Sequence, residues 1–322
     1  MSPAMETPAY ERPFCSGTAA IVGRGNVGKS TLLNALLRER LAIVTPTPQT
    51  TRDRILGVLR HGRAQIALVD TPGLHRPKSR LGRRMNATAR DAARGADVIV
   101  YVTSIPKKPQ GELVPLKGDI ELLEQLDPGE RAILVINKID LIAKTRELLL
   151  PLLDAFSKVR QFSSIVPISA LRENGTVLVL DEIAKLLPAR GPAYDEDFLT
   201  DRPMRFFASE YVREQVILAT KQEIPHSVAV IIDKYEESEK ITHIDAIVQC
   251  AKDSQRKIII GKGGERLKGI GIGARKRIET LIGCQVHLNL WVTTQEGWFD
   301  SSKALDSLGY VIESAELDEA TL

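Results

Sequence analysis

The sequence predicts a two-domain protein, an α/β domain with a mostly parallel sheet followed by a smaller α+β domain. Short apolar runs alternate with helix-forming runs between about residues 17 and 188, which is typical of parallel strands joined by helical crossovers. The composition then changes to prolines and acids, as in a linker. Beyond the linker, strands and helices no longer alternate. The predicted boundaries are an N-terminal extension 1–16, an α/β domain 17–188, a linker 189–203, an α+β domain 204–311 and an acidic tail 312–322.

The composition excludes several classes of protein. With 322 residues, 43% of them hydrophobic and 26% charged, the chain can bury two cores and is not predominantly disordered. The net charge of +3 gives only a weak general argument for nucleic-acid binding. No apolar stretch approaches the roughly 18 residues that a membrane span needs, and residues 1–14 lack the apolar core of a signal peptide. Three cysteines without C-x-x-C spacing favour a reducing compartment, so we expect a cytoplasmic protein.

Residues 23–34, Gly-Arg-Gly-Asn-Val-Gly-Lys-Ser-Thr-Leu-Leu-Asn, match the pattern G-x-x-x-x-G-K-S. An apolar run at 18–22 precedes the loop and a helix-forming run at 31–37 follows it. In such a loop, backbone N–H groups and the helix N-terminus surround a phosphate, Lys29 reaches the β and γ oxygens, and the Ser30 hydroxyl binds Mg²⁺. The pattern therefore predicts a nucleoside triphosphate site. The expected contacts are Gly23, Arg24, Gly25, Asn26, Val27, Gly28, Lys29, Ser30 and Thr31.

A second motif is expected beside this loop. The proline- and threonine-rich stretch 45–54 reads as a mobile loop, and a hairpin of strands at 55–60 and 64–70 follows it. The hairpin ends in Asp70-Thr-Pro-Gly73. A carboxylate at the carboxyl end of a strand near a phosphate loop can hold a Mg²⁺-bound water, and the Gly73 N–H can reach the terminal phosphate. Asp70, Thr71, Pro72 and Gly73 are therefore included in the candidate site.

Asn137-Lys-Ile-Asp140 indicates which base the site prefers. The Asp140 carboxylate can accept both the ring N–H and the amino group of guanine, whereas adenine would leave it unpaired. Lys138 can lie along the purine ring, Asn137 can tie its loop to neighbouring loops, and the backbone of Ser169-Ala170-Leu171 can touch the guanine O6. The intervening elements are predicted as a helix at 81–94, a strand at 97–102, a helix at 118–126, and strands at 131–136 and 164–168.

A basic cluster distinguishes the second domain. Between Lys252 and Arg277 there are nine Lys or Arg residues and two acids, a local charge of +7. Within it, Gly261-Lys-Gly-Gly264 lies between two short predicted helices and lets a nucleic-acid backbone approach bare main chain. This is the G-x-x-G pattern of a KH module, which holds about four single-stranded nucleotides. A solvated basic helix after a flexible turn is the alternative. The candidate RNA-binding residues are Lys257, Ile260, Gly261, Lys262, Gly263, Gly264, Arg266, Lys268 and Arg275.

Four isoleucines flank this pattern. Ile258, Ile259, Ile260 and Ile270 are expected either to line an apolar groove under the bases or to belong to the core. The rest of the domain is predicted as a helix at 205–223, strands at 228–233 and 241–250, a helix that reaches about residue 281, and a last strand at 285–293.

From about Gly17 to Val311 the chain resembles the Era family of bacterial GTPases. Besides the phosphate loop, the motifs that carry the resemblance are Pro48-Gln-Thr-Thr-Arg52, Asp70-Thr-Pro-Gly-Leu-His75, Asn137-Lys-Ile-Asp140, Thr200-Asp-Arg-Pro203, Gly261-Lys-Gly-Gly264 and Val286-His-Leu-Asn-Leu-Trp-Val292. The resemblance implies a Ras-like P-loop GTPase domain and a type II KH domain. It further implies GTP or GDP with Mg²⁺, binding near the 3′ end of 16S ribosomal RNA, a role in 30S subunit assembly, and peripheral contact with the inner membrane. A monomer is expected.

The resemblance also implies roles in catalysis. It favours Thr51 over Thr50 as a Mg²⁺ ligand beside Ser30 and Asp70, and it makes Asn26 a candidate K⁺ ligand. The residues expected to support hydrolysis are Lys29, Asn26, Thr51 and Gly73. Two departures from the family pattern are Gly25, where a proline is usual, and Thr103-Ser-Ile-Pro106, where Val-Asp-Ala is usual. Leu74 stands where Ras-type enzymes carry a glutamine, so the unaided rate is expected to be slow.

Other functions remain open at this point. An RNA-binding scaffold whose nucleotide site barely turns over is favoured by Leu74. An ATPase is disfavoured by Asp140. A membrane-associated cell-cycle regulator is the third alternative, because Lys and Arg clusters attract anionic lipid headgroups as well as RNA. The polar loops 45–54 and 71–84 are the expected switches, and their contact with the KH domain would couple the two sites.

Overall fold

The computed structural model describes residues 13–106, 113–126, 129, 131–220, 224 and 227–310. The chain forms two compact units, and each of them is built from three separate segments of the chain. The first contains the residues up to Ala42, Arg54–Thr71 and Arg90–Asp201. The second contains Ile43–Asp53, Pro72–Ala89 and the chain from Arg202 onward. Most of the two stretches expected to be switches therefore belongs to the second unit.

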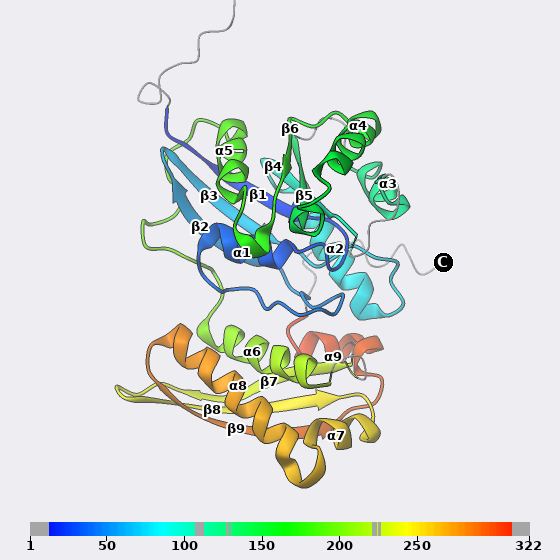
Figure 1. Cartoon of the computed structure of the whole chain (residues 1–322). Coiled ribbons are helices and arrows are strands. Elements are labelled where there is room, and N and C mark those ends of the chain that lie inside the picture. The colour runs from blue at the N-terminus through cyan, green and yellow to red at the C-terminus, as the bar shows by residue number, and fades with distance from the viewer. Residues whose placement is uncertain are drawn as a thin grey trace, which may run out of the picture. The chain divides into compact units, whose positions relative to one another are not determined.

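A six-stranded sheet forms the centre of the first unit, in the order β2-β3-β1-β4-β5-β6 (Figure 1). All neighbouring strands are parallel except the β2–β3 hairpin. The loop after β1 begins where the strand order reverses, which is the usual ligand position in doubly wound sheets. The strands are β1 Cys15–Val22, β2 Ile55–His61, β3 Ala64–Asp70, β4 Val98–Ser104, β5 Ala132–Asn137 and β6 Ser164–Pro167.

Helices cover both faces of this sheet (Figure 1). Helices α1 and α5 pack together on one face, and α3, α4 and the end of α2 contribute to the core on the other. The helices α4 and α5 were not among the elements predicted from the sequence. The bounds are α1 Lys29–Leu37, α2 Arg80–Arg94, α3 Lys117–Leu123, α4 Leu149–Val159 and α5 Thr176–Leu186.

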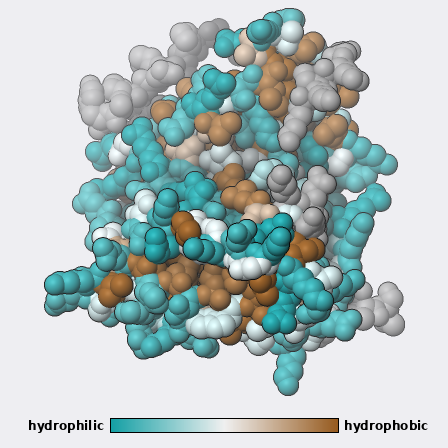
Figure 2. All heavy atoms as spheres, turned by 60° about the horizontal axis from the view of Figure 1, so that its bottom comes forward, coloured by the Kyte–Doolittle hydropathy of each residue, from teal (hydrophilic) through white to brown (hydrophobic). Residues whose placement is uncertain are grey.

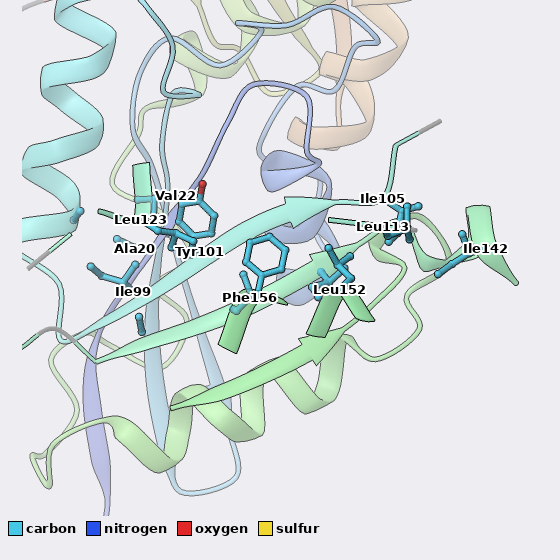
Figure 3. Packing of buried hydrophobic residues seen from close by; sticks show 14 residues of the cluster. Ala20, Val22, Ile99, Tyr101, Ile105, Leu113, Leu123, Ile142, Leu152 and Phe156 are labelled. Carbon is cyan, nitrogen blue, oxygen red and sulfur yellow. The ribbon is translucent and has the colours of Figure 1, made fainter. Parts of the chain in front are cut away.

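The core on the α4 face is built from long apolar side chains. Tyr101 of β4 and Phe156 of α4 each have 1% of their surface exposed, and Leu134 of β5 has none. Figure 3 shows the side chains of this cluster turning inward from the strands and helices. This packing fixes the carboxyl ends of β1, β4 and β5, from which the nucleotide motifs extend.

The second unit contains a three-stranded sheet in the order β7-β8-β9, with β7–β8 antiparallel and β8–β9 parallel. Side chains of α6, α7 and α8 form its core with β8. The elements are α6 Met204–Thr220, β7 Val228–Glu236, β8 Ile241–Cys250, α7 Asp253–Ile260, α8 Glu265–Ile282, β9 Gln285–Thr294 and α9 Ser302–Ser307. Only the first of the two helices around the glycine pattern is short, since α8 has 18 residues. The helix predicted at 205–223 corresponds to α6, and its last three residues, 221–223, lie outside the described residues.

A further apolar cluster joins the switch stretch 72–89 to the C-terminal part of this unit. Trp298 is completely buried and packs with Leu81 and Met85 of α2 and with Leu305 of α9. Its indole N–H donates to Ser227 O at 3.2 Å. The start of α2 is thus part of the core of the second unit.

The face shown in Figure 2 carries small apolar patches among hydrophilic side chains. None of the helices in the described part of the chain is long and apolar enough to cross a bilayer.

Candidate functional site

The phosphate loop is tightly packed against its own domain. A Cβ on Gly23 would lie 2.2 Å from Val102 O, and a Cβ on Gly28 would lie 2.4 Å from Asn137 Nδ2. Both glycines also have positive φ, 144° and 97°. Larger residues are therefore excluded from these positions by the packing of the loop. Lys29 and Ser30 begin α1 directly after Gly28.

Lys29 lies along this loop and is held there by two carbonyl groups. Its side chain is 6% exposed, and Nζ donates to Gly23 O at 3.2 Å and to Arg24 O at 3.0 Å. Burial lowers the pKa of Lys29 to about 8, against an opposing effect of Asp70. A phosphate bound nearby would favour the protonated ammonium and so oppose this shift.

Ser30 and Asp70 provide the oxygen atoms for a divalent cation. The Ser30 hydroxyl donates to Asp70 Oδ2 at 2.6 Å, and Asp70 has no exposed surface. Hydroxyl and carboxylate oxygens are the donors that Mg²⁺ prefers, so these two residues fit the ion. Thr71 braces the same region differently, because its hydroxyl donates to Ile21 O at 2.8 Å. Its side chain therefore serves the link between β3 and β1.

Asn137 connects three loops through one amide group. Its Nδ2 donates to Val27 O at 2.9 Å, and its Oδ1 accepts the N–H groups of Lys138 at 2.7 Å and Ala170 at 2.9 Å. The Lys138 ammonium donates to Asn26 O at 2.5 Å. The phosphate loop, the base-recognition loop and the loop after β6 are thus fixed relative to one another.

Asp140 is oriented by a neighbouring hydroxyl. Ser169 Oγ donates to Asp140 Oδ1 at 2.6 Å, which fixes the plane of the carboxylate. The sequence analysis predicted only a contact between the Ser169 backbone and guanine, and did not predict this role of its side chain. The N–H of Ala170 is already used by Asn137, and that of Ser169 donates to Asn174 O at 2.9 Å. The predicted contact between the backbone of residues 169–171 and the guanine O6 stays a prediction.

A buried charge pair supports the phosphate loop from the side, and sequence reasoning missed it. Arg24 Nε donates to Asp119 Oδ1 at 2.8 Å, and Asp119 of α3 has no exposed surface. Asp119 also accepts the hydroxyls of Tyr101 and Thr103, each at 3.0 Å. Thr103 is one of the positions that depart from the family pattern. That departure was the available signal, because a hydroxyl at the end of a buried strand requires a partner.

The switch stretches are ordered by contacts within the second unit. The hydroxyl of Thr50 donates to Thr47 O at 2.7 Å and lies 2.6 Å from the hydroxyl of Thr45, so it serves the loop itself. The preference for Thr51 as the metal ligand stays a prediction. Further along, His75 Nδ1 lies 2.9 Å from Gly73 O, and Asn86 Nδ2 donates to His75 O at 2.7 Å.

The G-x-x-G segment is much more open than the phosphate loop. A Cβ on Gly263 or Gly264 would meet no atom within 4 Å, and both residues have positive φ, 59° and 81°. Arg266 links the start of α8 to α7 across this segment, because its Nη1 donates to Ile258 O at 2.6 Å. The main chain at these glycines is accessible to a ligand.

A groove of about 450 Å³ adjoins this segment. Lys268 and Arg275, both predicted to bind RNA, lie on its wall, whereas Ile259 and Ile270 are buried in the core at 0% and 2% exposure. Of the two alternatives left open for the isoleucines, the core position is therefore the one that holds for Ile259 and Ile270. The apolar lining comes instead from α8 and β9, namely Leu267, Ile272, Val286, Leu288 and Leu290. The alternation along β9 was the sequence signal for the last three.

Comparisons with known proteins agree with both sites. A family described as "50S ribosome-binding GTPase" matches residues 18–138, and a KH domain family matches residues 223–299. The GTPase Era of Ruminiclostridium cellulolyticum is 39% identical over 92% of this chain and 98% of its own length. The GTPase Era of Marinobacter nauticus is 43% identical over 91% of this chain and 94% of its own length.

Solved structures give the same result. Era in complex with MgGDPNP and nucleotides 1506–1542 of 16S ribosomal RNA has a TM-score of 0.85 and 36% identity, covering 93% of this chain and 100% of that one. Era of Aquifex aeolicus bound to GDP and AlF4⁻ has a TM-score of 0.84 and 37% identity, covering 92% and 100%. With a GTPase domain, a KH domain and relatives aligned over nearly their whole length, the chain belongs to the Era family of GTPases.

Proposed function

We propose that this protein is a GTP-hydrolysing switch that binds the 3′ region of 16S ribosomal RNA and assists assembly of the 30S subunit. The observation that carries the proposal is that one chain holds both an Asp140 carboxylate oriented for guanine and a basic groove beside a G-x-x-G segment. The complex of a related Era with 16S nucleotides supports the choice of RNA. In this proposal residues 17–188 are the GTPase domain, 189–203 the linker and 204–311 the KH domain.

Hydrolysis would follow in-line attack of water on the γ-phosphate. Lys29 and the N–H of Gly73 would stabilise the negative charge that develops on the phosphate oxygens. Mg²⁺ bound by Ser30 and Thr51, with Asp70 acting through water, would supply further positive charge there. The Ser30–Asp70 distance of 2.6 Å supports this assignment.

The attacking water needs a partner other than a glutamine. Leu74 is apolar and cannot accept a hydrogen bond from the nucleophile, so the unaided rate is proposed to be slow. In the same proposal we assign Asn26 as a K⁺ ligand. The backbone turns sharply at this residue, which has a φ of 64°. Replacing K⁺ with Na⁺ should then lower turnover, and equal rates in the two salts would remove Asn26 from the mechanism.

The nucleotide and RNA sites would be coupled through the switch stretches. Arg213 of α6 is 1% exposed and donates from Nη2 to Thr50 O at 2.6 Å. The next residue, Glu214, accepts the N–H of Val44 at 3.0 Å and pairs with Arg277 of α8 at 3.1 Å. Movement of Thr51 on loss of the γ-phosphate would therefore act on α6 and α8, the second of which carries the groove.

RNA crosslinking and sequencing, carried out with GTP and with GDP, tests the function directly. Wild type should recover the 3′ region of 16S ribosomal RNA, with a difference between the nucleotide states. Gly263→Asp places a carboxylate in the G-x-x-G segment, and the variant should lose that RNA. Recovery of the same RNA by both proteins would contradict the KH assignment.

A scaffold that binds nucleotide without turnover is the second candidate, and Leu74 is the observation that favours it. Phosphate release above background that is lost in Lys29→Ala would reject the scaffold. Equal phosphate release from both proteins would reject the GTPase mechanism proposed above.

We also propose a cytoplasmic site of action with peripheral contact at the inner face of the membrane. Exposed cations of α7 and α8, including Lys257 at 80% side-chain exposure, support that contact. Co-sedimentation with phosphatidylglycerol vesicles should be lost at high salt. Absence of binding at low salt would reject the membrane contact and leave the RNA function untouched.

A further inference from the structure

A cavity of about 440 Å³ lies within the second unit, separate from the RNA groove. Its walls come from the end of the first switch stretch, from residues 75–85 of the second, and from Ser227 and Phe299. The volume is in the range of small-molecule sites, about 300–1,000 Å³. None of the functions assigned above uses this cavity.

The polar side of the cavity is cationic. Arg52, Arg76 and Lys78 line it together with His75, and none of the residues that line it is acidic. Two carboxylates of neighbouring segments are engaged in other contacts. Asp300 accepts the N–H of Arg80 at 2.9 Å, and Asp306 pairs with Arg84 at 2.6 Å. The lining therefore favours a negatively charged group such as a phosphate.

The cavity also has an apolar wall, which includes an aromatic ring. Leu81 and Met85 of α2 form this wall with Phe299. Phe299 packs edge-on against the buried Trp298, with ring centroids 6.0 Å apart. A planar apolar body can stack on such a wall, and the amide of Gln49 and the hydroxyl of Ser227 can hydrogen-bond to its edge.

We propose that this cavity is a binding site for a nucleoside monophosphate, with the phosphate at Arg52, Arg76 and Lys78 and the base against Phe299. Such a ligand contacts both switch stretches at once. Arg52 follows Thr51 directly, and it is held by Val228 O at 2.7 Å and by the ring of Trp298 at 5.6 Å from its centroid. His75 Nδ1 lies 2.9 Å from the carbonyl oxygen of Gly73. A ligand at this site is thus placed to act as an effector through Thr51 and Gly73, the switch residues next to its contacts.

Tryptophan fluorescence measures binding without relying on hydrolysis. The chain has two tryptophans, so Trp291→Phe leaves Trp298 as the single reporter next to Phe299 and Arg52. The protein is saturated with GDP to fill the phosphate loop and then titrated with adenosine 5′-monophosphate, whose base Asp140 disfavours. A saturable change is expected. Adenosine and inorganic phosphate, which each lack half of the ligand, should bind at least tenfold more weakly.

The double variant Arg76→Glu, Lys78→Glu should weaken adenosine monophosphate binding at least tenfold. Lys144→Glu, Arg146→Glu is the matched control, because it changes two exposed cations with the same spacing outside the cavity and should bind as wild type. Three results would overturn the proposal: no saturable change at millimolar ligand, equal affinity for inorganic phosphate and the nucleotide, or an unchanged affinity in the Arg76, Lys78 variant.

Discussion

The two glycine-rich loops of this chain need glycine for opposite reasons. In the phosphate loop, a Cβ on Gly28 would lie 2.4 Å from Asn137 Nδ2, so the space is already filled by the protein. In the G-x-x-G segment, a Cβ on Gly263 would meet no atom within 4 Å, so the space around it is open and its φ of 59° is what favours glycine. The first loop is rigid and preorganised, and the second exposes its main chain. Substitutions should therefore affect the first loop through its own packing and the second through what it binds.

The largest effect is expected for Gly28→Ala. The added methyl group would collide with the Asn137 amide at a φ of 97° and displace the residue that joins three loops. GDP affinity should fall about a hundredfold or more, since each 1.4 kcal/mol of lost interaction is a factor of ten. Titration with a fluorescent GDP analogue measures the change, and circular dichroism checks that the variant is folded. An affinity within threefold of wild type would break the comparison.

Gly263→Asp should leave the nucleotide site intact and weaken RNA binding about tenfold or more. The substitution adds a negative charge where a phosphate approaches and a side chain where φ is 59°. Gly283→Asp is the matched control, because it has a similar φ of 74°, is equally uncrowded, and lies at the end of α8 outside the groove. Filter binding and GDP titration are measured for both variants. Equal loss of RNA affinity in the two would show that charge anywhere on the domain suffices.

The pH dependence of GDP binding sharpens the account of the phosphate loop. Burial holds the pKa of Lys29 at about 8, so the free protein loses this proton as the pH rises through 8. Because phosphate binds the protonated form, affinity should be constant below that pKa and fall by up to about tenfold per pH unit above it. Calorimetric titrations from pH 7 to 9 measure the slope. Lys29→Arg keeps its charge and should lose the slope, whereas a persistent slope would assign it to another group.

The smallest effect is expected for Ser169→Ala. The Asp140 carboxylate would lose one hydrogen bond of 2.6 Å but keep its charge and position. A hydrogen bond to a charged group contributes about 1.5–3 kcal/mol, and solvent can replace part of it, so GDP affinity should fall about fivefold. Thr145→Ala, on an exposed residue of the next loop, is the control. An unchanged affinity would mean that Asp140 is oriented without Ser169.

The sequence was most informative where chemistry and backbone geometry coincide. The G-x-x-x-x-G-K-S pattern located β1, the loop and α1, because its two glycines, Gly23 and Gly28, have positive φ and no room for a Cβ. Contacts between distant residues were not accessible in this way. The Arg24–Asp119 pair spans 95 positions, and an aspartate at 119 is indistinguishable in sequence from a solvated helix residue. Similarly, Ile259 and Ile270 are core residues because of how α7 and α8 turn, which hydrophobicity alone does not specify.

The switch stretches show the same limit. Their polar, turn-rich composition predicted loops, but not that Arg213 would donate to Thr50 O or that Leu81 and Met85 would pack with Trp298. These contacts depend on which elements come together in the second unit. A residue such as Arg213 is therefore recognised only when its burial at 1% exposure is known.

The single amide of Asn137 has a consequence for nucleotide release. Because Val27, Lys138 and Ala170 all bond to this one group, the phosphate and base ends of the nucleotide site cannot open independently. Release of GDP should be concerted, with one barrier for both ends of the ligand. A factor that accelerates exchange then needs to displace only one of the three loops. Leu171, whose side chain is 79% exposed, lies in the loop after β6 and is accessible to such a factor.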